Sequence, residues 1–397
     1  MDIVIIGGST AGLAAAIALQ KTGHSVRVYE QSNLTEPTGL GVGLQPFAVE
    51  ALMSIGLTNI ASLGVPILST GFYTPDGKLL YAGKKTPEGA VTKVGIKRAV
   101  LQTALHNEAL KCLGPSSLYS HCELKHCHQD DNFVYATLHD KQANADFQIK
   151  ADLLLGADGL HSTVRSIIFP DQMQFNYSGI ITWRGMTVAD DFLKGRMLLM
   201  GGRKAKTVIY PAQYLPNGKV KIYWAAEVLQ ETQVLKTPIR NMPGHFDEFA
   251  GNFDGFKFEN IAVPDLYRSA TDVLKFPIVD REPMQSWVDK KIVLLGDAAH
   301  PMFPMGGNGA SQAIVDATTL ARSLRLSGNN VSKGLNQYMA LRLKKVNQVV
   351  RSNRSLGPDS ILTDAEASDA GMIKIDGLTH YREILEGYKS LTQPLGV

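Results

Sequence analysis

Residues 3–12 read IVIIGGSTAG, and this stretch decides the fold of the 397-residue chain. Four β-branched apolar residues run into a glycine, which predicts a buried strand of a parallel sheet. An Ala- and Leu-rich stretch over 12–22 stops at Gly23, as a helix does. A second strand is expected over 25–30. A strand–helix–strand unit of about thirty residues has the size of one half of a dinucleotide-binding fold.

The glycine-rich turn has the residues that a dinucleotide needs, with one departure. Backbone N–H groups at the helix start would face a pyrophosphate, and the helix dipole favours its charge. Gly7 allows the tight turn and Gly12 allows helix and strand to pack closely, but Ser9 replaces the middle glycine of G-x-G-x-x-G. Glu30 closes the second strand and is placed to bind ribose hydroxyls. The predicted cofactor residues of this unit are Gly7, Gly8, Ser9, Ala11, Gly12 and Glu30.

Two later segments also place an aspartate in a glycine-rich turn after a buried strand. In GADG at 156–159, Asp158 can cap a helix or hold a cofactor hydroxyl, and both interpretations stay open. In GDAAH at 296–300, Asp297 could accept a hydrogen bond from a ribityl chain. GGNG at 306–309 then starts a helix whose free N–H groups would stabilise negative charge on a reduced flavin. Together the three motifs predict one FAD wrapped by three separated segments.

Strands dominate from about residue 180 to 258, which predicts a second, mostly antiparallel lobe inserted between pieces of the first. We expect an α/β protein with a Rossmann-like FAD-binding lobe, an antiparallel β-sheet substrate lobe and C-terminal helices. A glycine-rich loop over 39–46 is expected at the pocket edge. The predicted division is 1–70, 93–177 and 271–330 for the FAD-binding lobe, 71–92 (a hairpin) and 178–270 for the substrate lobe, and 331–397 for the C-terminal helices.

Composition excludes several other classes of protein. Hydrophobic residues make up 44% and charged residues 19%, as in a soluble globular enzyme. The net charge of +3 is slight and no basic block is present, so no nucleic-acid partner is expected. Three cysteines indicate a reducing compartment. No signal peptide is visible, and the apolar run over 12–19 is shorter than the ~20 residues of a membrane span. We therefore expect a cytoplasmic enzyme without a transmembrane segment.

Some conspicuous side chains have two interpretations. The segment 121–128, HCELKHCH, looks like a cluster of metal ligands. Its alternation of apolar and polar residues fits a β-hairpin instead, so no metal is expected. His300 and Asp316 are expected to be structural, because a flavin carries the hard chemical step. Four aromatic residues on strands of the second lobe could be core or could face a flat aromatic substrate, and both remain open. They are Trp183, Tyr210, Tyr223 and Trp224.

The three motifs in this order resemble the single-component FAD aromatic hydroxylases, the family of p-hydroxybenzoate and salicylate hydroxylases. The likeness covers nearly the whole chain and is nearest to the branch that modifies phenazines. Its longest segments are GVGLQP at 41–46, ITWRG at 181–185, FPIVDR at 276–281 and GGNGASQA at 306–313.

The resemblance implies a role for each matching residue. Glu30 would bind the adenosine ribose, and Gln31 stands where many relatives carry Arg. Arg98 and Gln102 would contact FAD, and Leu124 would lie under the adenine. The other implied cofactor residues are Gly43, Asp158 (for both FAD and NAD(P)H), Asp297 (for the ribityl chain), Gly307 and Asn308 (for the isoalloxazine). Substrate contacts are expected from Gln45, Trp183, Tyr210, Trp224 and Pro304.

The implied activity is an NAD(P)H-dependent monooxygenase that hydroxylates an aromatic or N-heteroaromatic small molecule through a C4a-hydroperoxyflavin. No second dinucleotide fingerprint is present, so the nicotinamide donor is expected to lack its own Rossmann domain. Two alternatives stay open: a FAD oxidoreductase that inserts no oxygen, and a flavin-binding regulatory protein. The choice between NADH and NADPH, between monomer and homodimer, and any chemical role of His300 or Arg184 also stay open.

Overall fold

A six-stranded sheet forms the centre of the first lobe, in the order β21-β22-β12-β1-β2-β8. The computed structural model describes residues 1–36, 39–232, 234–235, 237–328, 330–369 and 377–394. All pairs in this sheet are parallel except β21–β22. Its strands are β1 (Asp2–Ile6), β2 (Ser25–Tyr29), β8 (Leu118–Tyr119), β12 (Leu153–Gly156), β21 (Val288–Asp289) and β22 (Ile292–Leu294).

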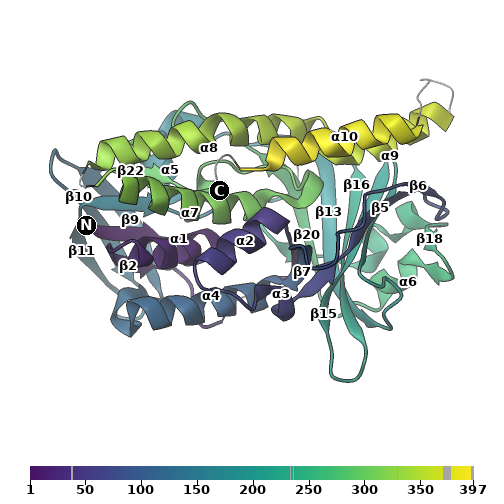
Figure 1. The fold of residues 1–397 in the computed structure, drawn as a ribbon, viewed down its shortest axis with the longest axis horizontal. Coiled ribbons are helices and arrows are strands. Elements are labelled where there is room, and N and C mark those ends of the chain that lie inside the picture. Colours follow the sequence, from purple (N-terminus) through teal and green to yellow (C-terminus); the bar gives the residue numbers. More distant parts are fainter. Residues whose placement is uncertain (37–38, 233, 236, 329, 370–376, 395–397) are drawn as a thin grey trace.

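Long helices pack together with this sheet (Figure 1). They are α1 (Thr10–Lys21), α4 (Arg98–Leu113), α7 (Gly309–Leu326) and α8 (Val331–Arg354). Helix α1 is buried from Thr10 to Leu19 because α4 and α7 both pack on it. An antiparallel sheet shares the same core and consists of β9 (Cys122–Gln129), β10 (Val134–Asp140) and β11 (Ala145–Ala151). Helix α5 (Thr163–Ile168) packs on β9.

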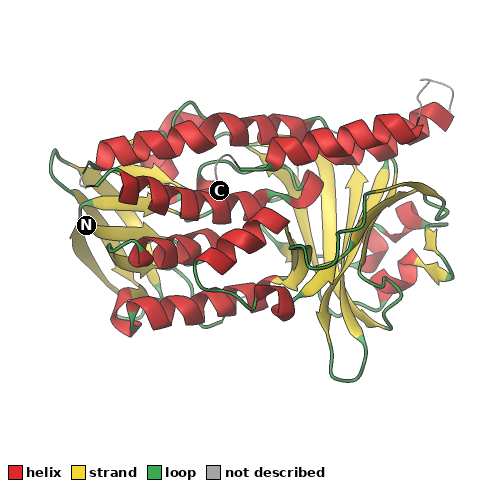
Figure 2. Cartoon of the chain, viewed as in Figure 1, coloured by secondary structure: helices red, strands yellow, loops and turns green. Residues whose placement is uncertain are grey.

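An eight-stranded sheet forms the second lobe, in the order β17-β20-β13-β16-β15-β14-β5-β6. It is antiparallel except where β14 runs parallel to β5. Figure 2 shows this sheet standing at the end of the helical lobe. Its strands are β5 (Ser69–Tyr73), β6 (Leu79–Ala82), β13 (Asn176–Ala189), β14 (Arg196–Gly201), β15 (Ala205–Tyr214), β16 (Val220–Leu229), β17 (Met242–Pro243) and β20 (Val273–Asp280). One face packs an aromatic core against α6 (Val263–Arg268) and the hairpin β18 (Lys257–Phe258) and β19 (Ile261–Ala262).

Small elements join the two lobes. A three-stranded sheet contains β3 (Gly41–Leu44), β7 (Lys93–Lys97) and β4 (Val65–Ile67), and β7 contacts β15 of the large sheet. Helices α2 (Pro46–Ser54) and α3 (Ile60–Leu63) follow β3 in the chain. The C-terminal helices α9 (Ser360–Asp369) and α10 (Gly377–Thr392) lie across the top of the second lobe in Figure 1. Short 3-10 turns complete the chain.

The expected fold class is confirmed, with two local differences. The glycine-rich stretch expected as a loop contains strand β3, which pairs with β7. Strand β20 falls within 271–330, which was predicted for the FAD-binding lobe, but it pairs with β13 in the eight-stranded sheet. The predicted hairpin in 71–92 is present as β5 and β6, which also pair in that sheet. The exact division of the chain between lobes remains a prediction.

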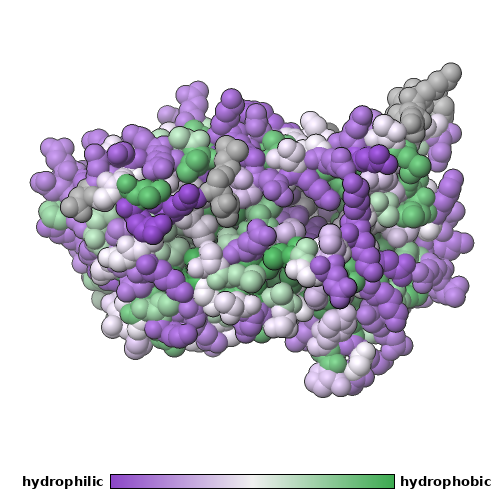
Figure 3. All heavy atoms as spheres, in the orientation of Figure 1, coloured by the Kyte–Doolittle hydropathy of each residue, from purple (hydrophilic) through white to green (hydrophobic). Residues whose placement is uncertain are grey.

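The surface is mostly hydrophilic in the view of Figure 3, and apolar residues appear in several small separate groups. Among the residues that the structure describes, none of the helices is long and apolar enough to cross a membrane.

Candidate active site

The first glycine motif forms the expected turn between β1 and α1. Gly7 has φ +103°, and a Cβ there would lie 2.4 Å from the carbonyl oxygen of Ala157 in the second motif. A Cβ on Gly12 would lie 1.8 Å from the carbonyl oxygen of Gly7, so only glycine permits this approach of helix and strand. Ser9 precedes α1 without capping it through its side chain. The first N–H groups of α1 therefore remain available to an anion.

Glu30 lies directly beside this turn, at the end of β2. Its Oε2 accepts a hydrogen bond from the Gly8 N–H at 2.7 Å, and its Oε1 accepts one from the Ser32 N–H at 2.9 Å. The neighbouring Gln31 is exposed. Two backbone donors thus hold the carboxylate beside the glycine-rich turn.

The further residues assigned to FAD by resemblance lie on α4 and β9. Arg98 begins α4, and its exposed side chain passes close to Gly39, where a Cβ would meet its Cδ at 2.9 Å. Gln102 follows one turn later and is half-buried. Leu124, on β9, is buried in the core of the first lobe.

Asp158 is a structural cap. Its Oδ1 accepts a hydrogen bond from Ser162 Oγ at 2.5 Å, and its Oδ2 accepts one from the Val164 N–H at 3.1 Å. Ser162 in turn caps α5 by accepting the Arg165 N–H at 2.9 Å. Burial raises the pKa of the Asp158 carboxyl. The capping role that the sequence left open is therefore present, and a second role towards a cofactor remains a prediction.

A buried hydrogen-bond network around Asp316 holds the third motif in place. Asp316 on α7 accepts the Gly296 N–H at 3.2 Å, contacts His300 Nε2 at 2.5 Å and accepts Arg342 Nε at 2.8 Å. Burial alone would raise the pKa of Asp316, but the neighbouring His300 and Arg342 lower it. His300 is 2% exposed and does not line the cavity described below. Both side chains have the structural positions expected, while Asp297 is exposed and lines the cavity.

The flavin end of the site is built by the turn before α7. Gly307 has φ +65°, and a Cβ there would meet no heavy atom within 4 Å. Asn308 Nδ2 donates to the hydroxyl of Tyr388 at 3.0 Å and to the carbonyl oxygen of Gly306 at 3.2 Å. The Oδ1 atom of Asn308 is buried without a hydrogen-bond partner. An open backbone surface beside an unsatisfied acceptor fits a flat ring system with N–H donors, as in an isoalloxazine.

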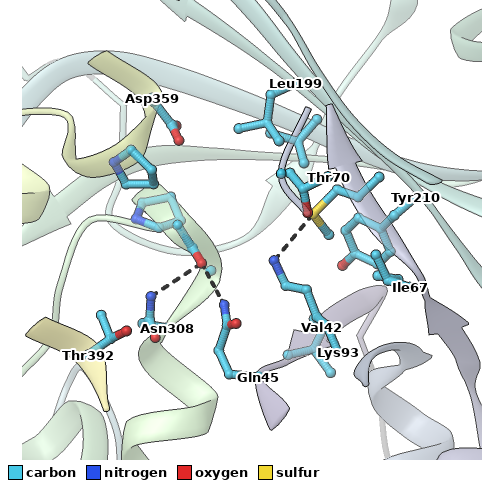
Figure 4. Close-up of a pocket in the computed structure, with 18 of the residues that line it drawn as sticks. Val42, Gln45, Ile67, Thr70, Lys93, Leu199, Tyr210, Asn308, Asp359 and Thr392 are labelled. Atoms are coloured by element: carbon cyan, nitrogen blue, oxygen red, sulfur yellow. Dashed lines mark hydrogen bonds between the residues drawn. The ribbon is translucent and has the colours of Figure 1, made fainter. Parts of the chain in front are cut away.

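A cavity of about 460 Å³ opens where the third motif and strand β3 meet the eight-stranded sheet, while the first two motifs do not line it. Gln45 reaches it from the end of β3, donating from Nε2 to the Gly306 carbonyl oxygen at 2.9 Å (Figure 4). Tyr210 and Tyr223 form an aromatic pair on the sheet wall, with ring centroids 4.7 Å apart. Pro304 also lines the cavity. Gly43, Asp297, Gly307 and Asn308 complete the set of predicted residues that the structure brings together here.

Trp183 and Trp224 do not reach this cavity, so the expected substrate contacts from them find no support. Trp183 stacks on Phe249 with centroids 5.2 Å apart, and its Nε1 donates to Glu248 at 2.6 Å. Trp224 is fully buried and donates to Thr187 Oγ1 at 3.1 Å. Both belong to the aromatic core on the opposite face of the sheet. Their core interpretation, which the sequence left open, is the one that the packing supports.

Sequence reasoning missed several residues of the cavity wall. Lys206 pairs with Glu227, its cross-strand neighbour on β16, at 2.9 Å and also with Asp359, which is 153 residues away in the sequence. Lys93 opens β7 and points into the cavity, and Tyr388 on α10 supports Asn308. No sequence motif marks these residues, because they come from different strands and helices that meet only in the folded protein. The predicted hairpin at 121–128 is present as β9 and β10, and the described residues contain no group of three His, Cys, Asp or Glu placed to hold a metal.

The fold and this site are those of a flavoprotein: the first lobe carries the glycine-rich turn of a dinucleotide-binding fold, and the third motif shares a cavity with the eight-stranded sheet. Comparison with known proteins identifies the class further. Residues 1–192 and 261–353 match the family described as the FAD binding domain, and the chain belongs to it. The protein is a flavin-dependent monooxygenase of the single-component aromatic hydroxylase type, with FAD as cofactor.

Two curated relatives span nearly the whole chain. A phenazine 1,6-dicarboxylic acid hydroxylase from Lysobacter antibioticus is 32% identical over 368 residues, with 89% of each chain covered. The 3-hydroxybenzoate 6-hydroxylase 1 of Aquipseudomonas alcaligenes is 30% identical over 370 residues, covering 89% of this chain and 88% of the relative. The structure of HpxO from Klebsiella pneumoniae with FAD and uric acid shares the fold, with a TM-score of 0.77, 22% identity and coverage of 100% and 98%.

Proposed function

We propose that this monooxygenase hydroxylates an aromatic or N-heteroaromatic small molecule in the cavity between its two lobes, with NAD(P)H and O2 as co-substrates. The strongest support is that two kinds of residues line the same cavity. Asp297, Gly307 and Asn308 of the third motif contribute one part of its lining, and the Tyr210–Tyr223 pair of the sheet contributes another. A volume of about 460 Å³ lies within the range of small-molecule sites. The names of both curated relatives point to aromatic acids as their substrates.

The proposed cofactor residues follow the three motifs. The start of α1 and Glu30 would hold the pyrophosphate and the adenosine ribose, and Asp297 would hold the ribityl chain. Bound FAD supplies the transfer of one oxygen atom from O2 to the ring after reduction by NAD(P)H. The N-terminus of α7, with the Gly307 backbone, favours negative charge at this end of the site. The remaining proposed cofactor contacts are Gly43, Arg98, Gln102, Leu124 and Asp158.

Substrate residues are proposed only from side chains that line the cavity. Tyr210 would offer a ring face, while Gln45 and Pro304 would border the substrate beside the flavin end. The role of these residues is to orient the ring and to exclude water rather than to supply a nucleophile. The three unpaired cysteines, Cys112, Cys122 and Cys127, support the proposal of a reducing, cytoplasmic setting.

The test is a substrate screen with the purified, FAD-loaded protein. NADH and NADPH oxidation is followed across aromatic acids, phenols and N-heterocycles, and each product is analysed by mass spectrometry. We expect some compounds to accelerate oxidation and to gain one oxygen atom. Accelerated oxidation without an oxygenated product would favour the oxidoreductase alternative. Slow oxidation that no compound accelerates would overturn the proposal and favour a regulatory flavoprotein.

A further inference from the structure

Lys93 is a cation of the cavity wall, and it forms no ion pair with any of the described residues. It begins β7, and its Nζ donates to Met197 Sδ on β14 at 3.3 Å, across the space between two sheets. A thioether is a weak acceptor. No hydrogen bond or ion pair with any other protein group is present for this ammonium within the described ranges. Its remaining N–H donors are therefore available to a ligand.

The backbone of β7 fixes the direction of this side chain. Residues 93 and 95 lie on the same face of the strand, since side chains alternate. At Gly95 this face packs so closely on β15 that a Cβ would lie 2.2 Å from the carbonyl oxygen of Pro211. Two residues earlier along β7, the side chain of Lys93 extends into the cavity beside Gly43. A Cβ placed on Gly43 would lie 3.7 Å from the Cε atom of Lys93. Figure 4 shows its Nζ in the open part of the cavity, with the hydroxyl of Tyr210 turned towards the same space.

Of the other cations of the lining, Lys206 and Lys84 are paired with carboxylates. Lys206 is neutralised by Glu227 and Asp359, and these carboxylates raise its pKa although burial alone would lower it. Lys84 pairs with Glu386 at 3.9 Å. Arg184 donates to Asn241 Oδ1 at 2.8 Å, but its buried Nε has no hydrogen-bond partner among the described residues, and Lys389 is exposed. Asp359 is engaged by Lys206 and forms no ion pair with Lys93, although its charge acts on Lys93 and raises the pKa of that ammonium.

An ammonium held in this way has a strong preference for an anionic ligand. Burial lowers the pKa of Lys93 to about 8; Asp359 opposes this shift and Lys389 adds to it, and the group is still mostly protonated at neutral pH. Hydrogen bonds between an ammonium and a carboxylate are about twice as strong as neutral ones, and partial desolvation strengthens them further. A carboxyl group has a pKa near 4, so an aromatic carboxylic acid carries a negative charge at neutral pH.

We propose that Lys93 selects aromatic substrates that carry a carboxylate, donating hydrogen bonds from Nζ to it while the ring lies against Tyr210. The inference rests on the proposed function only in placing an aromatic ligand in this cavity. It names Lys93 as a specificity-determining residue and aromatic carboxylates as the substrate class.

The test measures ligand binding by calorimetry on the FAD-loaded protein without NAD(P)H, so it does not depend on oxygen insertion. Two matched pairs serve as probes: phenazine-1-carboxylate with phenazine-1-carboxamide, and 3-hydroxybenzoate with 3-hydroxybenzamide. We expect at least one carboxylate to bind about tenfold more tightly than its amide, in line with one charge-assisted contact. Lys93→Met should abolish this preference and leave amide binding within about twofold, while Lys93→Arg should retain part of it.

Two controls keep the result interpretable. Lys84→Met removes a lysine at the cavity edge that is already paired, and it should preserve the preference. Flavin absorbance per protein and the melting temperature report whether Lys93→Met folds and holds FAD, and both should match the wild type closely. Equal weakening of acid and amide, loss of FAD in Lys93→Met, or no preference for either carboxylate would overturn the inference. Failure of the hydroxylation screen alone would not affect this binding result.

Discussion

Arg165 Nη1 donates to the carbonyl oxygens of both Ala298 and Ala299, each at 3.1 Å. The guanidinium is 1% exposed and comes from α5, directly after the second glycine motif, whereas its acceptors belong to the third. Two segments that are more than 130 residues apart in the chain are thereby fixed to each other. The close approach of Gly7 to Ala157 joins the first motif to the second. The three FAD motifs therefore form one connected scaffold.

Arg165→Met should loosen this scaffold. The substitution removes buried charge-assisted donors and leaves two carbonyl oxygens unsatisfied, so we expect the free energy of unfolding to fall by about 2–3 kcal/mol. FAD affinity should fall with it, because Asp297 stands next to the released segment. Urea denaturation and FAD titration measure the two effects. Arg351→Met, on an exposed position of α8, is the matched control and should change neither quantity. Unchanged stability in Arg165→Met would refute this account of the scaffold.

Asp316 predicts a pH dependence of stability. Its pKa is lower in the folded protein than the ordinary value of about 4, so its contribution is present above that value. The contribution is lost as the pH falls from about 4 through the lower folded pKa. Asp316→Asn should cost about 3–5 kcal/mol at pH 7, because it removes the buried partner of Arg342. Denaturation curves at several pH values should show the difference between wild type and variant shrinking below about pH 4.

Gly307 and Gly328 form a matched pair for testing the flavin end. Both have left-handed backbones, with φ +65° and +61°, and a Cβ would meet no heavy atom within 4 Å at either position. Alanine at either site should cost about 1 kcal/mol of stability through backbone strain. Gly307→Ala should in addition weaken FAD binding by about tenfold, since its methyl group would enter the cavity. Equal FAD affinities of the two variants would argue against an isoalloxazine beside Gly307.

The two faces of the eight-stranded sheet should separate substrate binding from stability. Trp224→Phe shrinks a fully buried side chain on the core face, so it should destabilise the protein by about 1–3 kcal/mol and leave KM unchanged. Tyr210→Phe changes only a hydroxyl on the cavity face, so it should alter KM with little effect on melting temperature. Steady-state kinetics and thermal melting on both variants provide the comparison. The reverse pattern would place the substrate on the other face.

The sequence predicted the motif-bearing turns well because each is a local structure. Gly7, Asp158 and Asp297 all follow buried strands at the expected positions, and parallel pairing brings the ends of those strands together. Strand β3 was missed because glycines disfavour strands. A glycine is needed at position 41 because of a residue that lies far away in the sequence. A Cβ at Gly41 would collide with the ring of Tyr223 at 2.6 Å.

The inward or outward direction of the sheet aromatics could not be read from the sequence. Strand β16 is buried at almost every position, since both of its faces are covered. Such a strand shows no alternation of polar and apolar residues, and Tyr223 and Trp224 therefore look equivalent although they point to opposite faces. Lys93 was overlooked because the residue that its ammonium group contacts, Met197, is 104 residues away in the sequence.

Oxygen labelling tests the central claim of a monooxygenase most directly. The FAD-loaded protein is supplied with NAD(P)H and an accepted aromatic compound under 18O2 gas, and the product is analysed by mass spectrometry. We predict one 18O atom per product molecule and one NAD(P)H consumed for each. A product that lacks the label, or oxidation that yields only hydrogen peroxide, would contradict the account.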